Sequence, residues 1–199
     1  MKTPNLTGFP SSSNPGWAFG TGTHPTTQVC LELLEGAFDF GQKTKDQNVL
    51  SVFSHRSSVI DIGCGSGILT IAARKLGAKN LLGVDIDPEA IDNAHQNAAL
   101  NGVAGEIEWG VGSVREIQGG QFSFEKADLL LANILAHVII RLLDQDMAEL
   151  LNKNGVMILS GILAEQEDSV YAALARHRLE VKDRRQVGDW VGLSARFTE

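Results

Sequence analysis

The stretch V-I-D-I-G-C-G-S-G (Val59–Gly67) decides the fold of this chain. A short β-branched run leads into glycines at alternate positions, and apolar residues at helical spacing follow as far as Leu76. Glycines at such a point let the backbone approach a ligand closely, and the helix behind them presents free N–H groups. Strand, glycine turn and helix in this order predict a ligand-binding loop at the carboxyl edge of a sheet.

The rest of the chain repeats this alternation. Besides the run at 58–62, strand patterns fall at 80–84, 107–111, 128–132, 155–160, 179–184 and 190–197. Helical patterns fall at 25–38, 66–76, 87–101, 135–151 and 165–177. Alternation predicts an α/β fold: a mainly parallel sheet with helices on both faces. The last two strands have no helix between them, which predicts an antiparallel hairpin.

Composition narrows the class of protein. The chain has 199 residues, of which 43% are apolar and 21% charged, which is typical of one soluble globular domain. Its net charge of −7 argues against direct nucleic-acid binding. Cys30 and Cys64 are far apart and form no disulfide framework, so we expect a cytoplasmic protein. No signal peptide or membrane span is visible, and no membrane association is expected.

The spacing of the glycines separates one ligand class from another. A dinucleotide fingerprint, G-x-G-x-x-G, would need a third glycine at position 68, which is Ile68. No G-K-[ST] follows the loop, so it is no P-loop. A nicotinamide-dependent dehydrogenase is therefore disfavoured.

Polar residues stand where two predicted strands end. Asp85 ends the second strand beside the glycine loop, where a carboxylate can accept hydrogen bonds from a ribose diol. Asp87 precedes Pro88 and is predicted to cap the next helix, although either Asp could cap it. Asn133 ends the fourth strand and is expected to face the ligand, the alternative being a helix cap.

Other candidate residues have plainer explanations. Cys64 has no histidine partner in view and is expected to be a packed side chain. His24 could be a general base, or it could serve the start of the helix that follows. No histidines pair at metal-ligand spacing, so no metal site is expected. Trp109 and Trp190 are interpreted as sheet packing.

Six stretches together resemble one known family. They are P-G-W-A-F-G-T-G-T-H-P-T-T (15–27), V-I-D-I-G-C-G-S-G-I-L (59–69), G-V-D-I-D-P (83–88), A-N-I-L-A (132–136), L-S-G-I-L (159–163) and D-W-V (189–191). The glycine loop alone marks only the class I S-adenosylmethionine-dependent methyltransferases. With the other stretches, the chain resembles the PrmA type, which methylates the eleventh protein of the large ribosomal subunit.

The resemblance implies a Rossmann-like, seven-stranded, mostly parallel sheet with an antiparallel last strand. It implies S-adenosylmethionine as cofactor, with the following cofactor-binding residues: Phe19, His24, Thr27, Gly63, Gly65, Asp85 and Asn133. It assigns no nucleophile, general base or metal ligand. We hypothesise that Asn133 orients the acceptor amine while water takes its proton. The implied activity is methyl transfer to lysine or N-terminal amines of a basic ribosomal protein.

The chain also departs from that family. We expect residues 1–16 to form a tail or linker and 17–199 the methyltransferase domain, with a surface insertion at about 39–58. We expect the separate N-terminal substrate-recognition domain that such members usually carry to be absent here. Other acceptors therefore stay open, namely another protein's lysine or a small molecule. A non-catalytic, cofactor-binding module also stays open, and the oligomeric state is not predicted.

Overall fold

The computed structural model describes residues 23–43 and 57–198, which fold around one seven-stranded sheet. The strands are β1 (Ser58–Ile62), β2 (Asn80–Asp85), β3 (Glu108–Val111), β4 (Ala127–Asn133), β5 (Leu151–Leu163), β6 (Leu179–Val187) and β7 (Trp190–Phe197). Their order is β3-β2-β1-β4-β5-β7-β6. β7 is antiparallel to both of its neighbours, and the other pairs are parallel. The predicted Rossmann-like sheet is confirmed.

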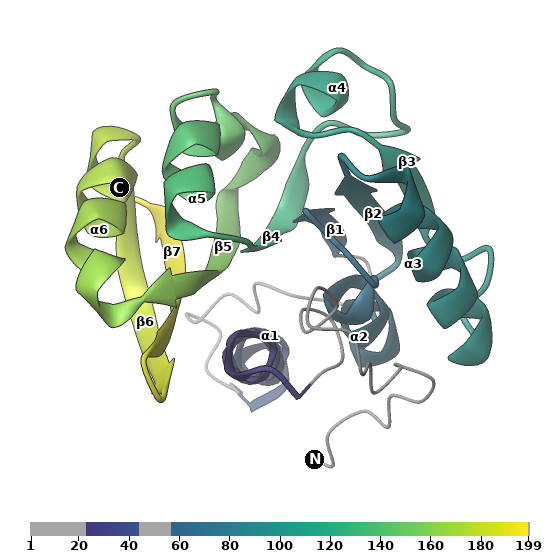
Figure 1. Cartoon of the computed structure of the whole chain (residues 1–199), viewed down its shortest axis with the longest axis horizontal. Helices are drawn as coiled ribbons and strands as arrows, with labels where there is room; N and C mark the ends of the chain where they lie inside the picture. Colours follow the sequence, from purple (N-terminus) through teal and green to yellow (C-terminus); the bar gives the residue numbers. More distant parts are fainter. Residues whose placement is uncertain (1–22, 44–56, 199) are drawn as a thin grey trace.

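Helices cover both faces of the sheet (Figure 1). One face carries α1 (Pro25–Lys43), α2 (Ile68–Leu76) and α3 (Pro88–Leu100). The other carries α4 (Val114–Gln118), α5 (Ala136–Leu143) and α6 (Glu167–Arg176). Two short 3-10 turns, η2 (Met147–Leu150) and η3 (Ala164–Gln166), flank β5. Within the described residues, no helix is long and apolar enough to cross a membrane.

Alternate residues of each central strand pack into two separate hydrophobic cores, one on each face of the sheet. On β4, Leu130 packs with α5 and α6, whereas Leu131 packs with α1 and α2, and both are fully buried. This period of two explains why the strands read as continuous apolar runs rather than as alternating patterns. The same alternation shows on which face of the sheet a polar residue at the end of a strand lies.

The structure corrects the predicted helix at 135–151. α5 ends at Leu143, Asp146 adopts a left-handed φ of 63°, and β5 begins at Leu151. The apolar period misled the prediction because η2 buries Met147 and Leu150 at spacings that continue the helical pattern. α4 was missed because it spans only five residues.

The N-terminal predictions are tested only in part. α1 runs five residues beyond the predicted end at Phe38, so the first residues of the predicted insertion at 39–58 are helical. The tail at 1–16, Phe19 and the remainder of that insertion up to residue 56 lie outside the described residues.

Glycine at position 161 lets β5 pass close to the end of β4. Gly161 has a φ of 82°, and a Cβ there would lie 2.3 Å from the carbonyl oxygen of Ile134. The Ile134 N–H donates to the carbonyl of Ser160 at 3.1 Å. No other residue type fits this conformation and this contact together. The register of β5 against β7 shifts here, between Leu159 and Ile162.

Candidate functional site

Polar side chains from four elements meet at the carboxyl edge of the sheet. Asp61, Asn133 and Ser160 lie on the neighbouring strands β1, β4 and β5, and the strand register pairs Asn133 with Ser160. Their position along the strands puts all three on the face that α1 covers, since Val59, Leu131 and Ile158 two residues earlier belong to that core. α1 lies against this edge, because the Cys30 thiol on that helix hydrogen-bonds with Ser160 and is close enough to Asp61 to feel its charge.

The glycine loop is fixed to the neighbouring strand β2. The N–H groups of Gly63 and Cys64 both donate to the carbonyl of Val84, at 2.8 and 3.0 Å. Gly63 has a φ of 70°, and a Cβ on it would lie 2.5 Å from the Ile134 side chain. The loop after β1 thus lies directly against the turn after β4. The two predicted ligand-binding turns are neighbours in space.

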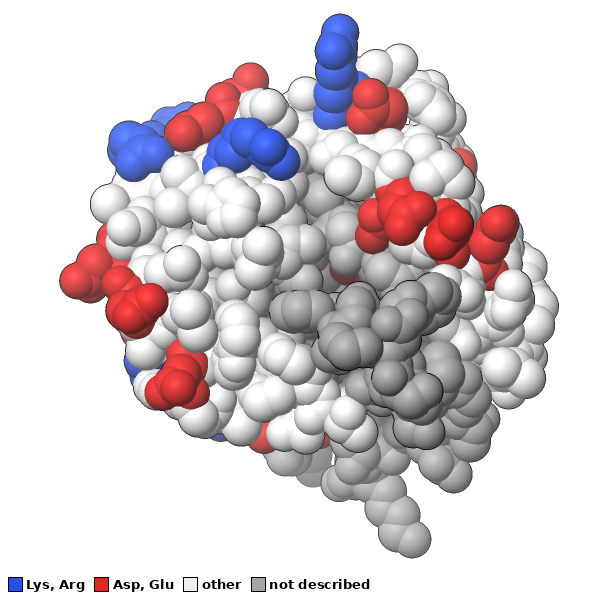
Figure 2. Space-filling model, in the orientation of Figure 1, with Lys and Arg blue, Asp and Glu red and all other residues white. Residues whose placement is uncertain are grey.

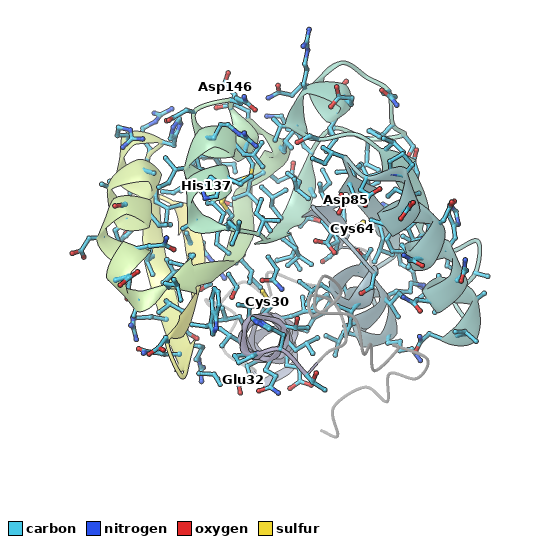
Figure 3. The ribbon with its side chains drawn as sticks, in the orientation of Figure 1. Cys30, Glu32, Cys64, Asp85, His137 and Asp146 are labelled. Carbon is cyan, nitrogen blue, oxygen red and sulfur yellow. The ribbon has the colours of Figure 1, made fainter. Side chains whose placement is uncertain are left out.

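Asp85 joins the glycine loop to the end of β2. Its Oδ2 accepts the N–H of Gly65 at 2.9 Å, and its Oδ1 accepts the N–H of Asp87 at 3.1 Å. Asp87 caps α3 by accepting the N–H of Glu89, as predicted. The two acids therefore have different roles. Figure 3 shows Asp85 beside Cys64 of the loop, and each carboxylate oxygen keeps capacity for one more hydrogen bond.

Asp61 is the residue that sequence reasoning passed over. It is 1% exposed, and its Oδ2 accepts the Thr70 hydroxyl at 2.6 Å. Its Oδ1 has no partner within the described part of the chain. Burial raises the pKa of Asp61 to about 7, the Thr70 hydrogen bond opposes this, and the charge of Asp85 adds to it. An acid inside a buried apolar strand was the available signal.

The side-chain oxygen of Asn133 resembles the Oδ1 atom of Asp61. It is buried and lacks a hydrogen-bond partner among the residues the structure describes. The alternative role as a helix cap is wrong, because α5 has Leu135 as its N-cap. Buried polar atoms without partners are uncommon and costly, so two at one strand edge point to a bound group that donates hydrogen bonds.

His24 begins the helix above this edge. Its Nδ1 accepts the N–H of Thr26 at 3.3 Å, and its carbonyl accepts the N–H of Thr27 at 3.0 Å. The helix-start role is therefore present. Burial lowers the pKa of His24, and its ring meets Trp190 edge to face at 5.3 Å between centroids.

The cysteines are not activated. Burial, followed by the charges of Asp61 and Asp85, raises the pKa of the Cys64 thiol. Burial also raises the pKa of Cys30, which lies beneath the site on α1 (Figure 3). Both are free and buried, in keeping with packed side chains. In the described ranges, no three metal-binding side chains gather.

The fold is that of a class I methyltransferase. Four features define it: the sheet order with its antiparallel β7, the glycine loop after β1, the acid that ends β2 and the amide that ends β4. Over residues 12–198 the chain matches the family described as "Ribosomal protein L11 methyltransferase (PrmA)". The chain belongs to this family.

Three individual relatives are similar to this chain. Ribosomal protein L11 methyltransferase of Alkaliphilus oremlandii is 40% identical over 180 residues, covering 90% of this chain and 51% of its own. That of Clostridium botulinum strain Eklund 17B is 42% identical, covering 89% and 50%. The crystal structure of ribosomal protein L11 methylase from Lactobacillus delbrueckii subsp. bulgaricus superposes with a TM-score of 0.71 at 33% identity, covering 87% and 79%. The chain spans about half the length of the curated relatives it matches.

Proposed function

We propose that this chain transfers the methyl group of S-adenosylmethionine to amine nitrogens of a large-subunit ribosomal protein, namely L11. The observation that carries the proposal is a pair of buried oxygens beside the glycine loop, on Asp61 and Asn133, that have no hydrogen-bond partner among residues 23–43 and 57–198. Membership of the family supports the substrate, because the relatives are named for it.

The residues at this edge fit the cofactor. S-adenosylmethionine carries an ammonium group, a ribose diol and a methyl group on a sulfonium, and it supplies that methyl to a nucleophile. The Asp61 oxygen that lacks a partner among the described residues suits an ammonium donor, and Asp85 suits the diol. Gly63 and Gly65 leave the backbone open for close approach. His24, Thr27 and Phe19 remain predicted cofactor contacts, Phe19 on its position in the motif alone.

Asn133 is proposed to orient the acceptor. A lysine amine, with a pKa near 10.4, is neutral in about one molecule in a thousand or fewer at pH 7. The side-chain oxygen of Asn133 accepts an N–H of the neutral amine and directs its lone pair, while water takes the proton released. The protein needs no nucleophile of its own for this displacement.

The charge of the chain suits a basic protein partner. Seventeen Lys and Arg stand against 24 Asp and Glu. On the face seen in Figure 2, one group of acidic side chains lies to the right of the centre and others follow the left side, while the basic ones lie at the top and upper left, next to further acids. Attraction between this surface and a basic ribosomal protein would speed encounter. The buried free thiols fit the reducing cytoplasm that we propose as its location.

The first test is intact-mass spectrometry of purified L11 after incubation with this chain and S-adenosylmethionine. We expect mass gain in single-methyl steps. Asp85→Ala should weaken cofactor binding about 10- to 100-fold, since hydrogen bonds to the carboxylate are lost. The matched control is Asp87→Ala, which should cost about 1 kcal/mol of stability as a lost helix cap and leave cofactor affinity unchanged. Cofactor binding without any methylated L11 would refute the proposed substrate.

The proposed role of Asn133 predicts a kinetic effect different from that of Asp85. Asn133→Ala should lower kcat about 100- to 1,000-fold, as measured for other oriented polar groups, with little change in cofactor affinity. Single-turnover kinetics with saturating cofactor separate the two effects. Full turnover by this variant would contradict the orienting role.

A further inference from the structure

A polar side chain lies on the buried face of α3. The buried residues of this helix are Ile91, Ala94, Asn97 and Ala98, and Asn97 alone among them is polar. Asn97 is 5% exposed, and asparagine is a poor helix former, so neither burial nor helix propensity favours it there. Its side-chain amide donates instead to the carbonyl of Ser66 in the glycine loop, at 2.9 Å. A buried amide that bonds outside its own helix points to a role in the loop it reaches.

This hydrogen bond fixes one end of a peptide group whose other end is also held. The carbonyl of Ser66 and the N–H of Gly67 belong to the same planar peptide. Asn97 donates to that carbonyl, and the N–H donates to the carbonyl of Cys64 at 2.9 Å. Gly67 has a φ of 76°, and a glycine backbone has more accessible conformations than any other. The two hydrogen bonds therefore determine which way this peptide faces.

α3 also supports the loop by packing. A Cβ on Gly67 would lie 3.1 Å from the Cβ of Ala94, which precedes Asn97 by three residues on the same face of the helix, and 2.6 Å from the ring of Trp109. The loop thus rests on α3 at two neighbouring points, one a contact and the other a hydrogen bond. Its remaining anchors are at the end of β2, the strand that leads into α3.

The groups that fit the cofactor come from other elements than the groups that hold the loop. The oxygens of Asp61 and Asn133 that lack partners among the described residues are on β1 and β4. The loop is held from β2 and α3. A change at Asn97 therefore reaches the cofactor through the shape of the loop, and it leaves those two oxygens in place.

We propose that Asn97 is a positioning residue for the cofactor: by holding the Ser66–Gly67 peptide, it keeps the glycine loop in the shape that binds S-adenosylmethionine. The inference rests on the proposed function. A loop that adopts other shapes binds its ligand more weakly, in proportion to the fraction that is competent. Asn97 acts before the methyl group moves, so it should govern cofactor affinity and leave the rate of transfer from bound cofactor unchanged.

The first experiment titrates S-adenosylhomocysteine, the demethylated cofactor, into the full chain and its variants. Asn97→Ala should raise the Kd about 5- to 100-fold, because a buried carbonyl loses its donor. Asn101→Ala is the matched control, since Asn101 is also buried and its amide donates to the backbone carbonyl of Asn97, at 2.9 Å. Its Kd should not change. Equal weakening by the two variants, or no weakening by Asn97→Ala, would overturn the proposal.

A second variant keeps the shape of the side chain and changes only its hydrogen bonding. Asn97→Asp replaces the amide by a carboxyl group, which donates only when it is protonated. At pH 8 this variant should bind S-adenosylhomocysteine about 5- to 100-fold more weakly than the wild type. At pH 5 the ratio of the two affinities should move back toward one, because burial raises the pKa of a carboxyl group and the proton restores the donor. Taking the ratio at each pH cancels the titration of other groups. The same ratio at both pH values would contradict the proposed hydrogen bond.

A third measurement needs neither cofactor nor turnover. Hydrogen exchange of the Gly67 N–H, followed by NMR in the full chain labelled with ¹⁵N-glycine, reports how often the peptide leaves its orientation. Asn97→Ala should speed this exchange, whereas the Gly119 N–H, which donates to the carbonyl of Arg115, should exchange as before. Unchanged exchange at Gly67 overturns the proposal. The proposed function would fail separately, by a wild-type chain that binds no S-adenosylhomocysteine or leaves L11 unmethylated.

Discussion

The two edges of the sheet differ in how completely their polar groups are partnered. At the amino edge, where α5 and α6 end, Asp144 accepts from Arg176 at 3.1 Å and lies 3.3 Å from His177. Asp144 and Arg176 are exposed, His177 is partly so, and the three groups partner one another. At the carboxyl edge, one side-chain oxygen of Asp61 and one of Asn133 are buried without a partner among the described residues.

The two edges differ in what their polar groups contribute to the stability of the fold. Exposed ion pairs are satisfied by the protein and by water, and they contribute little to stability. Buried unpaired oxygens cost stability and are tolerated where a ligand completes them. Among the described residues, the carboxyl edge is therefore where we propose that another molecule completes the polar groups.

The largest expected effect concerns how closely the carboxyl edge is packed. Gly161→Ala places an alanine at a left-handed φ and puts its Cβ 2.3 Å from the carbonyl oxygen of Ile134. The variant should therefore lose about 3–5 kcal/mol of unfolding free energy. Urea denaturation measures it. The control is Gly36→Ala on α1, where nothing lies within 4 Å, and stability should rise by about 0.5–1 kcal/mol. Equal effects of the two would refute the packing argument.

Asp61 should make the carboxyl edge sensitive to pH. Because its pKa of about 7 lies above the unfolded value, the folded state holds a proton that the unfolded state releases between about pH 4 and 7. Stability is therefore lost as pH rises through that window. Between pH 5 and 8, wild type should lose about 2 kcal/mol more than Asp61→Asn. Parallel pH profiles from urea denaturation of the two proteins would show that Asp61 does not titrate there.

The smallest effect is expected at the amino edge. Hydrogen bonds from Arg176, then His177, lower the pKa of Asp144, so its contribution is present above the unfolded pKa and is lost as pH falls through the folded one. Asp144→Asn should change the Tm at pH 7 less than either variant above, and high salt should erase the change. A large decrease in Tm that high salt does not reverse would contradict the proposed difference between the two edges.

The sequence predicted most of the fold because its signals were local. The strand at 190–197 and the glycine loop after β1 were found where the structure has them, and Asp87 caps α3 as expected. The break after α5 could not be found, because η2 continues the apolar period while Asp146 leaves the helical conformation with a left-handed φ. Local composition does not record such a turn.

The grouping of residues at the candidate site was predictable in part. Asp85 and Asn133 follow strands directly, so their shared edge follows from topology. The proximity of Trp190 and His24 could not be predicted, because they are distant in sequence and meet only when α1 packs on β7. That the Oδ1 atom of Asp61 has no partner among the described residues is likewise a property of three-dimensional packing.

The place of β7 has a consequence for the order in which the protein can be made. β7 follows β6 in the chain, yet it lies between β5 and β6 in the sheet. While the ribosome is still adding residues up to Phe197, β5 has an unpaired edge and β6 has no neighbour. The half-sheet that carries Trp190 therefore closes last, after the half with the glycine loop has been synthesised.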